Sequence, residues 1–301
     1  MTHQNASARR LRALQRATTS RLHRLILRKT GRWLQFDPNR PSNFPLDIVT
    51  PIIPKDVPVF RVTCRLLRAN LLHPLGTHYV IGPRDAAIID ACRDLDCVFI
   101  DENEVAPVSI SRLREIYSDY PRDRSGWLFQ QLLKLNADTV ATSPNFLLID
   151  ADTAFVRPVR MEIGGRWIFD VTNGYEAAYD ESIERLLGLR APLPFSFVVH
   201  FMVFNAPVLH KMRTDIAERF GAPWAKAILK NLDFDNFLCF SEWNLYANFA
   251  LRGVHLPHRI GYWFNREGRL DVESDVDAQI QDLSDGAKTV SFHYYKRKRS
   301  A

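Results

Sequence analysis

The chain has 301 residues, of which 46% are hydrophobic and 11% aromatic, so it is long enough for one large domain or two small ones. No apolar run approaches the roughly 20 residues of a membrane span, and no long apolar segment follows the basic N-terminus, which argues against a secretory signal. The chain has four cysteines, Cys64, Cys92, Cys97 and Cys239. They show neither metal-ligand spacing nor a disulfide framework, which predicts a reducing, cytoplasmic location.

The net charge of +6 is unevenly distributed along the chain. Residues 1–40 hold ten Lys and Arg residues against one acid, Asp37, so this segment carries +9 and the remainder −3. A second basic cluster occupies residues 296–299. A nucleic-acid enzyme more often spreads its basic surface over the fold, so we expect no nucleic-acid partner.

Residues 7–35 are predicted to form one amphipathic helix. Arginines occupy most of its faces. The remaining face has side chains suited to a buried stripe, which recur at three- and four-residue steps: Leu11, Leu14, Thr18, Leu22 and Leu25. Such a helix suits an anionic membrane surface, which would make the protein peripheral on the inner face of the membrane, but it also fits a helix docked on a protein or a frayed tail. We therefore divide the chain into a basic helix and linker at 1–40 and a folded domain at 41–301.

Strands and helices alternate from residue 46 onward. Apolar runs predict strands at 46–50, 78–81, 97–100 and 146–149, and helical periodicity predicts helices at 57–72, 85–93 and 126–141. This alternation is typical of an α/β fold with a mainly parallel sheet and right-handed crossovers. Beyond residue 155 the pattern is less regular, and we expect strands at 197–204 and 289–294 and helices at 207–219 and 241–251.

The apolar run at 146–149 leads directly into two acids, Asp150 and Asp152. An unpaired buried carboxylate is unfavourable, so acids at the end of a buried strand indicate either a solvated turn or a bound cation. Alternate side chains of an extended strand point to opposite faces, so both acids can bind one ion only if the chain turns at Asp152 or one acts through water. Carboxylate oxygens suit Mg or Mn, and ligands of open α/β sheets bind at the carboxyl ends of strands.

The helix predicted at 126–141 carries Gln131 and Lys134 on its polar face, one helix before the Asp150 strand. Lys134 could therefore reach the same site and meet a phosphate or a carboxylate. The alternative is an ordinary solvated lysine.

Several segments together resemble the GT-A glycosyltransferases of the glycogenin and galactosyltransferase-like type. The Lys134-Leu135 pair and the strand that ends in Asp150-Ala151-Asp152-Thr153 resemble the Lys-Leu and Asp-x-Asp-Thr pattern of that family. Three further segments follow in the expected order and are similar to its FNSG strand, its DQ helix start and its C-terminal HF-x-G-x-x-KPW segment: Met202–Ala206, Ser241–Tyr246 and Ser291–Lys296. The sequence around Lys134 and Ser241 looks closer still to a poorly characterised bacterial family of GT-A-like proteins.

The chain also departs from this pattern. Ala206 and Pro207 stand where Ser-Gly is usual, Ser241 and Glu242 replace Asp and Gln, and the C-terminal segment lacks its Gly. The changes at Ser241 and Glu242 put the contacts of the family with the sugar in doubt.

The resemblance covers roughly residues 46–296 and implies a Rossmann-like GT-A nucleotide-diphospho-sugar transferase fold. It implies a hexosyltransferase-like enzyme that uses Mn or Mg to transfer a sugar from a nucleotide-diphosphate sugar to a glycan or lipid-linked acceptor, as in bacterial surface polysaccharide synthesis. Residue by residue, it implies three metal ligands, Asp150, Asp152 and His293. The implied donor contacts are Thr50, Pro51, Gln131, Lys134, Asn205 and Lys296.

The chemistry of glycosyl transfer also requires a carboxylate near the sugar, as a base or as a stabiliser of the oxocarbenium-like transition state. Glu242, at a predicted helix start, is our candidate for this catalytic role. The alternative is a helix acid that interacts with the helix dipole, and the other candidate bases are Asp170, Asp180, Asp233 and Asp235.

Two other functions fit parts of the pattern. The first is a non-catalytic nucleotide-sugar-binding module with a degenerate transferase fold, which the departures at Ala206 and Ser241 favour. The second, less favoured, is a haloacid-dehalogenase-type phosphatase. That class needs Thr or Val where this chain has Ala154, and its motif lies near the start of the domain.

Overall fold

The computed structural model describes residue 25 and residues 40–172, 174, 176–190, 195–236 and 238–292. Apart from Leu25, the helix predicted at 7–35 lies outside the described residues, as do His293 and Lys296. The division of the chain at residues 40 and 41 therefore stays a prediction. Within the described ranges, no helix combines the length and the apolar character needed to cross a bilayer.

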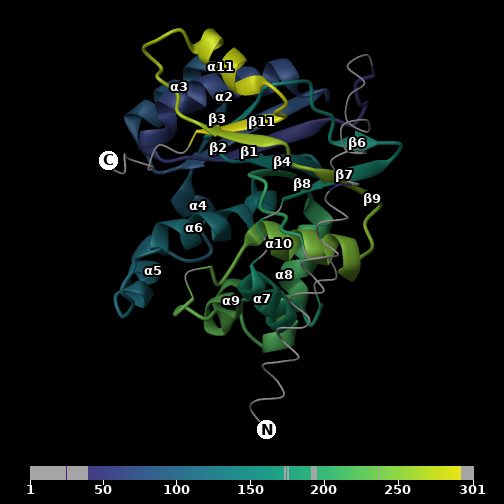
Figure 1. Cartoon of the computed structure of the whole chain (residues 1–301). Helices are drawn as coiled ribbons and strands as arrows, with labels where there is room; N and C mark the ends of the chain where they lie inside the picture. The colour runs from purple at the N-terminus through teal and green to yellow at the C-terminus, as the bar shows by residue number, and fades with distance from the viewer. Residues whose placement is uncertain are drawn as a thin grey trace.

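The central sheet has five strands in the order β3-β2-β1-β4-β8 (Figure 1). Neighbouring strands are parallel except for β8, which runs antiparallel to β4. This arrangement confirms the predicted α/β fold with a mainly parallel sheet. The strands are β1 (Leu46–Pro51), β2 (Leu75–Gly82), β3 (Val98–Asp101), β4 (Asn145–Ile149) and β8 (Phe201–Asn205).

Helices cover both faces of this sheet. Figure 1 shows α2 (Val57–Asn70) and α3 (Ala86–Asp94) above it and α6 (Ser125–Lys134), α8 (Ala206–Phe220) and α10 (Glu242–Asn248) below it. Strands covered on both faces need apolar side chains along their whole length. Every residue of β1 is buried, and so are residues 146–149 of β4, which explains why a continuous apolar run predicted these strands.

The helix predicted at 126–141 ends earlier than expected, because α6 stops at Lys134. The carbonyl of Leu135 accepts a hydrogen bond from the guanidinium of Arg213 in α8, at 3.0 Å, instead of continuing the helical pattern. A short 3₁₀ turn then occupies Ala137–Thr139. The helices predicted at 57–72, 85–93 and 207–219 are confirmed, and the one at 241–251 is α10 followed by a π-helical turn at Phe249–Gly253.

Several elements were not predicted. Two small sheets have the orders β10-β11-β5 and β6-β7-β9. Their strands are β5 (Thr153–Phe155), β6 (Glu162–Ile163), β7 (Arg166–Val171), β9 (His258–Tyr262), β10 (Asn265–Gly268) and β11 (Thr289–Phe292). Of these, β11 confirms the strand predicted at 289–294 as far as Phe292, the last described residue. The additional helices are η1 (Pro54–Asp56), α4 (Glu102–Val105), α5 (Ile110–Tyr117), α7 (Ala177–Leu187), α9 (Trp224–Asn231) and α11 (Val276–Ser284).

Candidate functional site

A cavity of about 610 Å³ lies at the carboxyl ends of three central strands. Pro51 of β1, Ile81 of β2 and Asp150 after β4 line one side, and Gln131 of α6 and Glu242 of α10 line another. We call this cavity the cleft. Its position at the carboxyl edge of a mainly parallel sheet is the place where ligands of open α/β sheets bind.

The two acids follow β4 on a tight turn. The Thr153 amide donates to the Asp150 carbonyl at 3.1 Å, and the carbonyl of Asp152 accepts from the Phe292 amide at 2.9 Å. The hydroxyl of Thr63 in α2 donates to the Ala151 carbonyl at 2.7 Å. Because the chain turns here, Asp150 and Asp152 both line the cleft instead of pointing to opposite faces of an extended strand.

His200 places a third potential metal ligand beside these two acids. It lies immediately before β8, and since β8 is antiparallel to β4, the start of β8 is beside the end of β4. The Asp150 amide donates to the His200 carbonyl at 2.9 Å, and His200 Nδ1 lies 3.7 Å from Asp150 Oδ2. His200 has a φ of 63°, an unusual backbone conformation for a residue with a Cβ atom.

One ligand atom from each of Asp150, Asp152 and His200 lies within 4.8 Å of the others. We call these three residues the carboxylate cluster. Ligands on opposite sides of one Mg ion lie about 4 Å apart, so small side-chain shifts would bring all three onto one ion. Two carboxylates and one imidazole form a donor set that suits Mn or Mg, and the residues present therefore fit the expected cation.

Lys134 lies between two carboxylates. Its Nζ is 2.5 Å from Asp150 Oδ1 and 2.8 Å from Glu242 Oε1, and it lies over the ring of Trp243. Burial alone would lower the pKa of Lys134, but the attraction of Asp150 and Glu242 outweighs it and raises this pKa above its usual range. Lys134 therefore stays an ammonium and meets carboxylates, the second of the two partners that the sequence left open.

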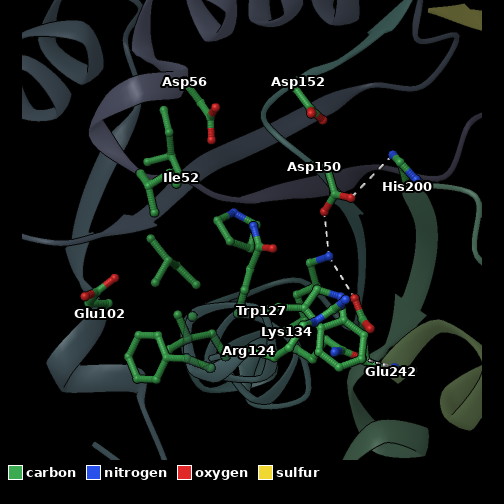
Figure 2. A pocket seen from close by; sticks show the side chains of 18 of the residues that line it. Ile52, Asp56, Glu102, Arg124, Trp127, Lys134, Asp150, Asp152, His200 and Glu242 are labelled. Atoms are coloured by element: carbon green, nitrogen blue, oxygen red, sulfur yellow. Dashed lines mark hydrogen bonds and ion pairs between the residues drawn. The ribbon is translucent and has the colours of Figure 1, made fainter. Parts of the chain in front are cut away.

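Figure 2 shows the resulting line of contacts, which runs from Glu242 through Lys134 and Asp150 to His200. Glu242 is the first residue of α10, and its side chain is 3% exposed. Its amide donates to Gln131 Oε1 at 3.2 Å, so Gln131 holds the start of the helix. Burial raises the pKa of Glu242, and Lys134 opposes this shift. Glu242 is thus a buried, paired carboxylate in the wall of the cleft.

The predicted donor contacts are only partly brought together. Pro51, Gln131 and Lys134 line the cleft. Thr50 does not: its hydroxyl lies 2.9 Å from His78 Nε2 within the protein.

Asn205 lies at the other end of the sheet. Its side chain caps α8 through the Val208 amide and donates to Asn145 at the start of β4, away from Asp150. The reason is that β8 runs antiparallel to β4. The N-terminal end of β8 therefore lies at the cleft, and its C-terminal end, with Asn205, lies at the opposite edge of the sheet. His200 is therefore the residue of this segment that reaches the site.

Other charged residues that the sequence did not single out also line the cleft: Lys55, Asp56, Glu102, Arg114 and Arg124. Burial raises the pKa of Asp56 to about 6; Lys55 opposes this shift, and Asp152 and Asp150 add to it. The guanidinium of Arg124 lies 3.8 Å from the centre of the Trp127 ring. In Figure 2, Asp56 and Asp152 lie toward one end of the cleft, and Arg124 and Trp127 toward the other.

None of the fallback acids considered from the sequence (Asp170, Asp180, Asp233 and Asp235) lines this cleft. Asp170 instead forms a buried ion pair with Lys288.

A family model matches residues 75–270, more than half of the chain, and its description is "Family of unknown function (DUF6492)". No curated protein matches the sequence. Similar solved structures include a galactosyltransferase, LgtC, in complex with donor and acceptor sugar analogs (13% identity, 82% of this chain and 87% of that chain, TM-score 0.45). Mouse xyloside xylosyltransferase 1 in its apo form is another (11% identity, 85% of this chain and 100% of that chain, TM-score 0.38).

Proposed function

We propose a glycosyltransferase activity for this chain, which belongs to the family of unknown function DUF6492. In this proposal the chain transfers a sugar from a nucleotide-diphosphate sugar to an acceptor hydroxyl in the cleft. The observation that carries the proposal is the convergence of Asp150, Asp152 and His200 at the carboxyl edge of the sheet, beside a cavity of about 610 Å³. Small-molecule sites have volumes of about 300–1,000 Å³, so the cavity suits a nucleotide sugar.

The carboxylate cluster would hold a Mn or Mg ion, and such an ion neutralises the charge that develops on a diphosphate leaving group. Arg114 and Arg124 place further positive charge on the cleft wall. Apolar surface from Pro51, Ile52 and Trp127 suits the base and ribose. His200 takes the position that the sequence gave to His293, and a further contribution from His293 stays a prediction.

Lys134 determines which oxygen of Asp150 is available. Its ammonium contacts Oδ1, whereas Oδ2 lies on the side of His200. Asp150 would therefore offer Oδ2 to a cation, and Lys134 would act as a positioning residue. Its charge is already balanced by two carboxylates, so we assign contact with the phosphates to Arg114 and Arg124 instead.

Glu242 remains our candidate for the carboxylate near the sugar, because it lines the cleft on the far side of Lys134 from Asp150. The same geometry favours a second candidate function, a non-catalytic nucleotide-sugar-binding module. A carboxylate that is 3% exposed and held at 2.8 Å by a lysine is poorly placed to accept a proton from an acceptor.

Both functions can be tested on the full chain with uridine, guanosine and thymidine diphosphates and the matching nucleotide sugars. We expect Mn-dependent binding of at least one diphosphate in calorimetry, and slow release of that diphosphate from its sugar conjugate. Asp152→Asn should lose both, whereas Asp235→Asn, which removes an exposed acid outside the cleft, should retain both. Binding without release would support the non-catalytic module, and the absence of any Mn-dependent binding would contradict both proposals.

The acceptor and the location form a separate part of the proposal. We propose a glycan or lipid-linked acceptor in bacterial surface polysaccharide synthesis, with the protein at the inner face of the membrane through residues 1–40. The support is the net charge of +9 in this segment, because each Lys or Arg near an anionic bilayer contributes about 1 kcal/mol.

The full chain should sediment with phosphatidylserine vesicles at low salt and less at high salt. Replacing the arginines between Arg9 and Arg32 by Gln should abolish sedimentation, and unchanged sedimentation would contradict the membrane role.

A further inference from the structure

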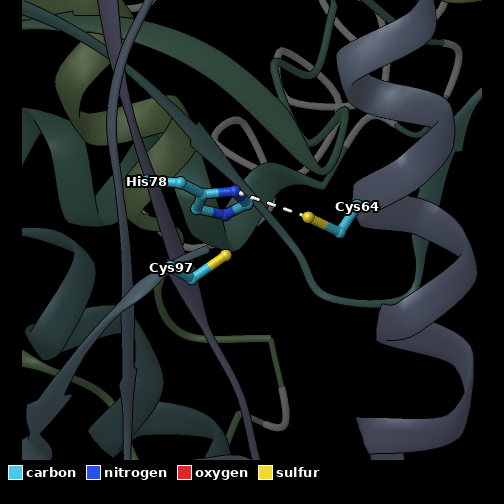
Figure 3. Close-up of side chains that lie close together, drawn as sticks. All are labelled: Cys64, His78 and Cys97. Atoms are coloured by element: carbon cyan, nitrogen blue, oxygen red, sulfur yellow. Dashed lines mark hydrogen bonds between the residues drawn. The ribbon is translucent and has the colours of Figure 1, made fainter. Parts of the chain in front are cut away.

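A second group of ligand-type side chains lies outside the cleft, between α2 and the central sheet (Figure 3). Cys64 comes from α2, His78 from β2, and Cys97 immediately precedes β3. One ligand atom from each lies within 4.8 Å of the others. We call these three residues the thiol cluster, and we propose that it is a zinc site.

The spacing of the ligand atoms suits one tetrahedral ion. Cys64 Sγ lies 3.7 Å from His78 Nδ1. With Zn–S bonds of about 2.3 Å and Zn–N bonds of about 2.0–2.1 Å, two ligands of a tetrahedral zinc lie about 3.5–3.8 Å apart. The pair is therefore already at the separation that a shared ion requires. Thiolate and imidazole ligands also bind zinc in preference to Mg or Mn.

The other side of the imidazole has the partner that a metal-bound histidine needs. His78 Nε2 lies 2.9 Å from the hydroxyl oxygen of Thr50. When Nε2 carries the proton and donates it to Thr50, Nδ1 presents its lone pair on the side of Cys64. Such an outer hydrogen bond fixes the tautomer and the orientation of a metal-ligating histidine.

The surroundings of the thiol cluster favour a structural ion. Cys64 and His78 are 2% and 5% exposed, and Phe60 packs edge-on against the imidazole ring. Cys97 is partly exposed, which provides a path for the metal, and the guanidinium of Arg68 lies 3.6 Å from its sulfur. Cys64 and burial raise the pKa of Cys97, whereas this positive group lowers it.

The thiol cluster is connected to the cleft through α2 and β1. Thr63, the neighbour of Cys64, holds the Ala151 carbonyl in the turn between Asp150 and Asp152. Thr50, the partner of His78, precedes Pro51 in the cleft wall. A zinc ion in the thiol cluster would therefore fix two elements that shape the cleft, without itself contacting the substrate. This inference does not depend on the reaction proposed for the cleft.

Cobalt provides a direct test, because Co²⁺ bound by thiolates has a charge-transfer absorption in the near ultraviolet that oxygen ligands do not give. We would titrate the reduced, chelator-treated full chain with CoCl₂ and then displace the cobalt with ZnCl₂. The expected result is one equivalent of thiolate-bound cobalt in the full chain and in Asp152→Asn. Cys64→Ser and Cys97→Ser should lose the thiolate absorption, whereas Cys239→Ser, which changes a buried cysteine outside the cluster, should keep it.

A milder variant tests the outer hydrogen bond. Thr50→Val keeps the shape of the side chain and removes the hydroxyl, so zinc affinity should fall by about 10- to 100-fold, as is typical when an outer partner of a ligand is lost. A second measurement requires no variant: zinc should slow alkylation of the partly exposed Cys97 by iodoacetamide in the native chain. Equal alkylation with and without zinc would overturn the proposal. So would a missing thiolate absorption, or a Cys64–Cys97 disulfide in the freshly isolated chain.

Discussion

The carboxylate cluster and the thiol cluster contain three ligand residues each, but they differ in ligand type and in access. Asp150 and His200 are 18% and 19% exposed and belong to a cleft at the edge of the sheet. Cys64 and His78 are nearly inaccessible between α2 and the sheet. Hard oxygen ligands with open positions suit an ion that meets a phosphate, whereas soft, largely buried ligands suit an ion that stabilises the fold.

The two sites would serve different purposes and yet share one helix. Thr63 and Cys64 are consecutive residues of α2, and one holds the turn of the carboxylate cluster while the other belongs to the thiol cluster. Because each cluster has its own ligands and only α2 connects them, a substitution in one cluster should leave metal binding in the other largely unchanged.

Removing the ammonium that supports the carboxylate cluster should destabilise the whole protein. Lys134→Met leaves Asp150 and Glu242 as close carboxylates without their shared partner. Breaking a buried ion pair by removing one partner reduces the free energy of unfolding by about 3–5 kcal/mol. Urea unfolding followed by circular dichroism measures this loss.

The matched control is Lys211→Met, which removes an exposed lysine paired with Asp215 one helical turn away. Exposed pairs of this type contribute about 0.3–0.5 kcal/mol, so the two lysine variants should differ several-fold in their effect. Similar losses in both variants would show that Lys134 does not support the buried carboxylates.

Asp152→Asn should reduce Mn-dependent binding of the nucleoside diphosphate by more than about 100-fold, because changing a ligand should exceed the 10- to 100-fold loss seen for outer partners of ligands. The thiolate–cobalt absorption should stay unchanged, since the thiol cluster has its own ligands. Calorimetry and the cobalt titration measure the two responses on the same preparation. Wild-type diphosphate affinity in this variant would remove Asp152 from the proposed site.

Glu242→Gln should separate catalysis from binding. The amide keeps the size of the side chain and an oxygen that accepts from Lys134, but it removes the charge. If Glu242 meets the reacting sugar, turnover should fall by about 100-fold, the lower end of the range for general acid–base groups, with the dissociation constant of the donor unchanged. Diphosphate release in a single-turnover assay measures this effect, and unchanged turnover would assign the carboxylate role to another acid of the cleft, such as Asp56 or Glu102.

Local sequence patterns predicted much of the fold. β1, β4, α2 and α8 came from continuous apolar runs or helical periodicity, both of which depend on neighbouring residues. Asp150 and Asp152 could be selected because they follow a buried strand directly.

His200 could not be found in this way. Its proximity to Asp150 depends on β8 running antiparallel to β4, and strand direction is a property of the whole sheet. Asn205 was named through the family resemblance, and the structure places it at the opposite end of β8 from the cleft. The thiol cluster was missed because its three ligands come from three separate elements, so no characteristic spacing exists along the chain.

The smallest effect should come from the contact that connects the two clusters. Thr63→Val removes the hydroxyl that donates to the Ala151 carbonyl and keeps the branched shape of the side chain. A hydrogen bond of this type contributes about 1 kcal/mol, which corresponds to about a 5-fold change in an equilibrium constant. If the bond fixes the turn between Asp150 and Asp152, Mn affinity should fall by about this factor, with the thiolate–cobalt absorption retained. Calorimetric Mn titration measures the change. A loss as large as that in Asp152→Asn would mean that α2 carries more of the carboxylate cluster than one hydrogen bond, and unchanged affinity would mean that the clusters are independent.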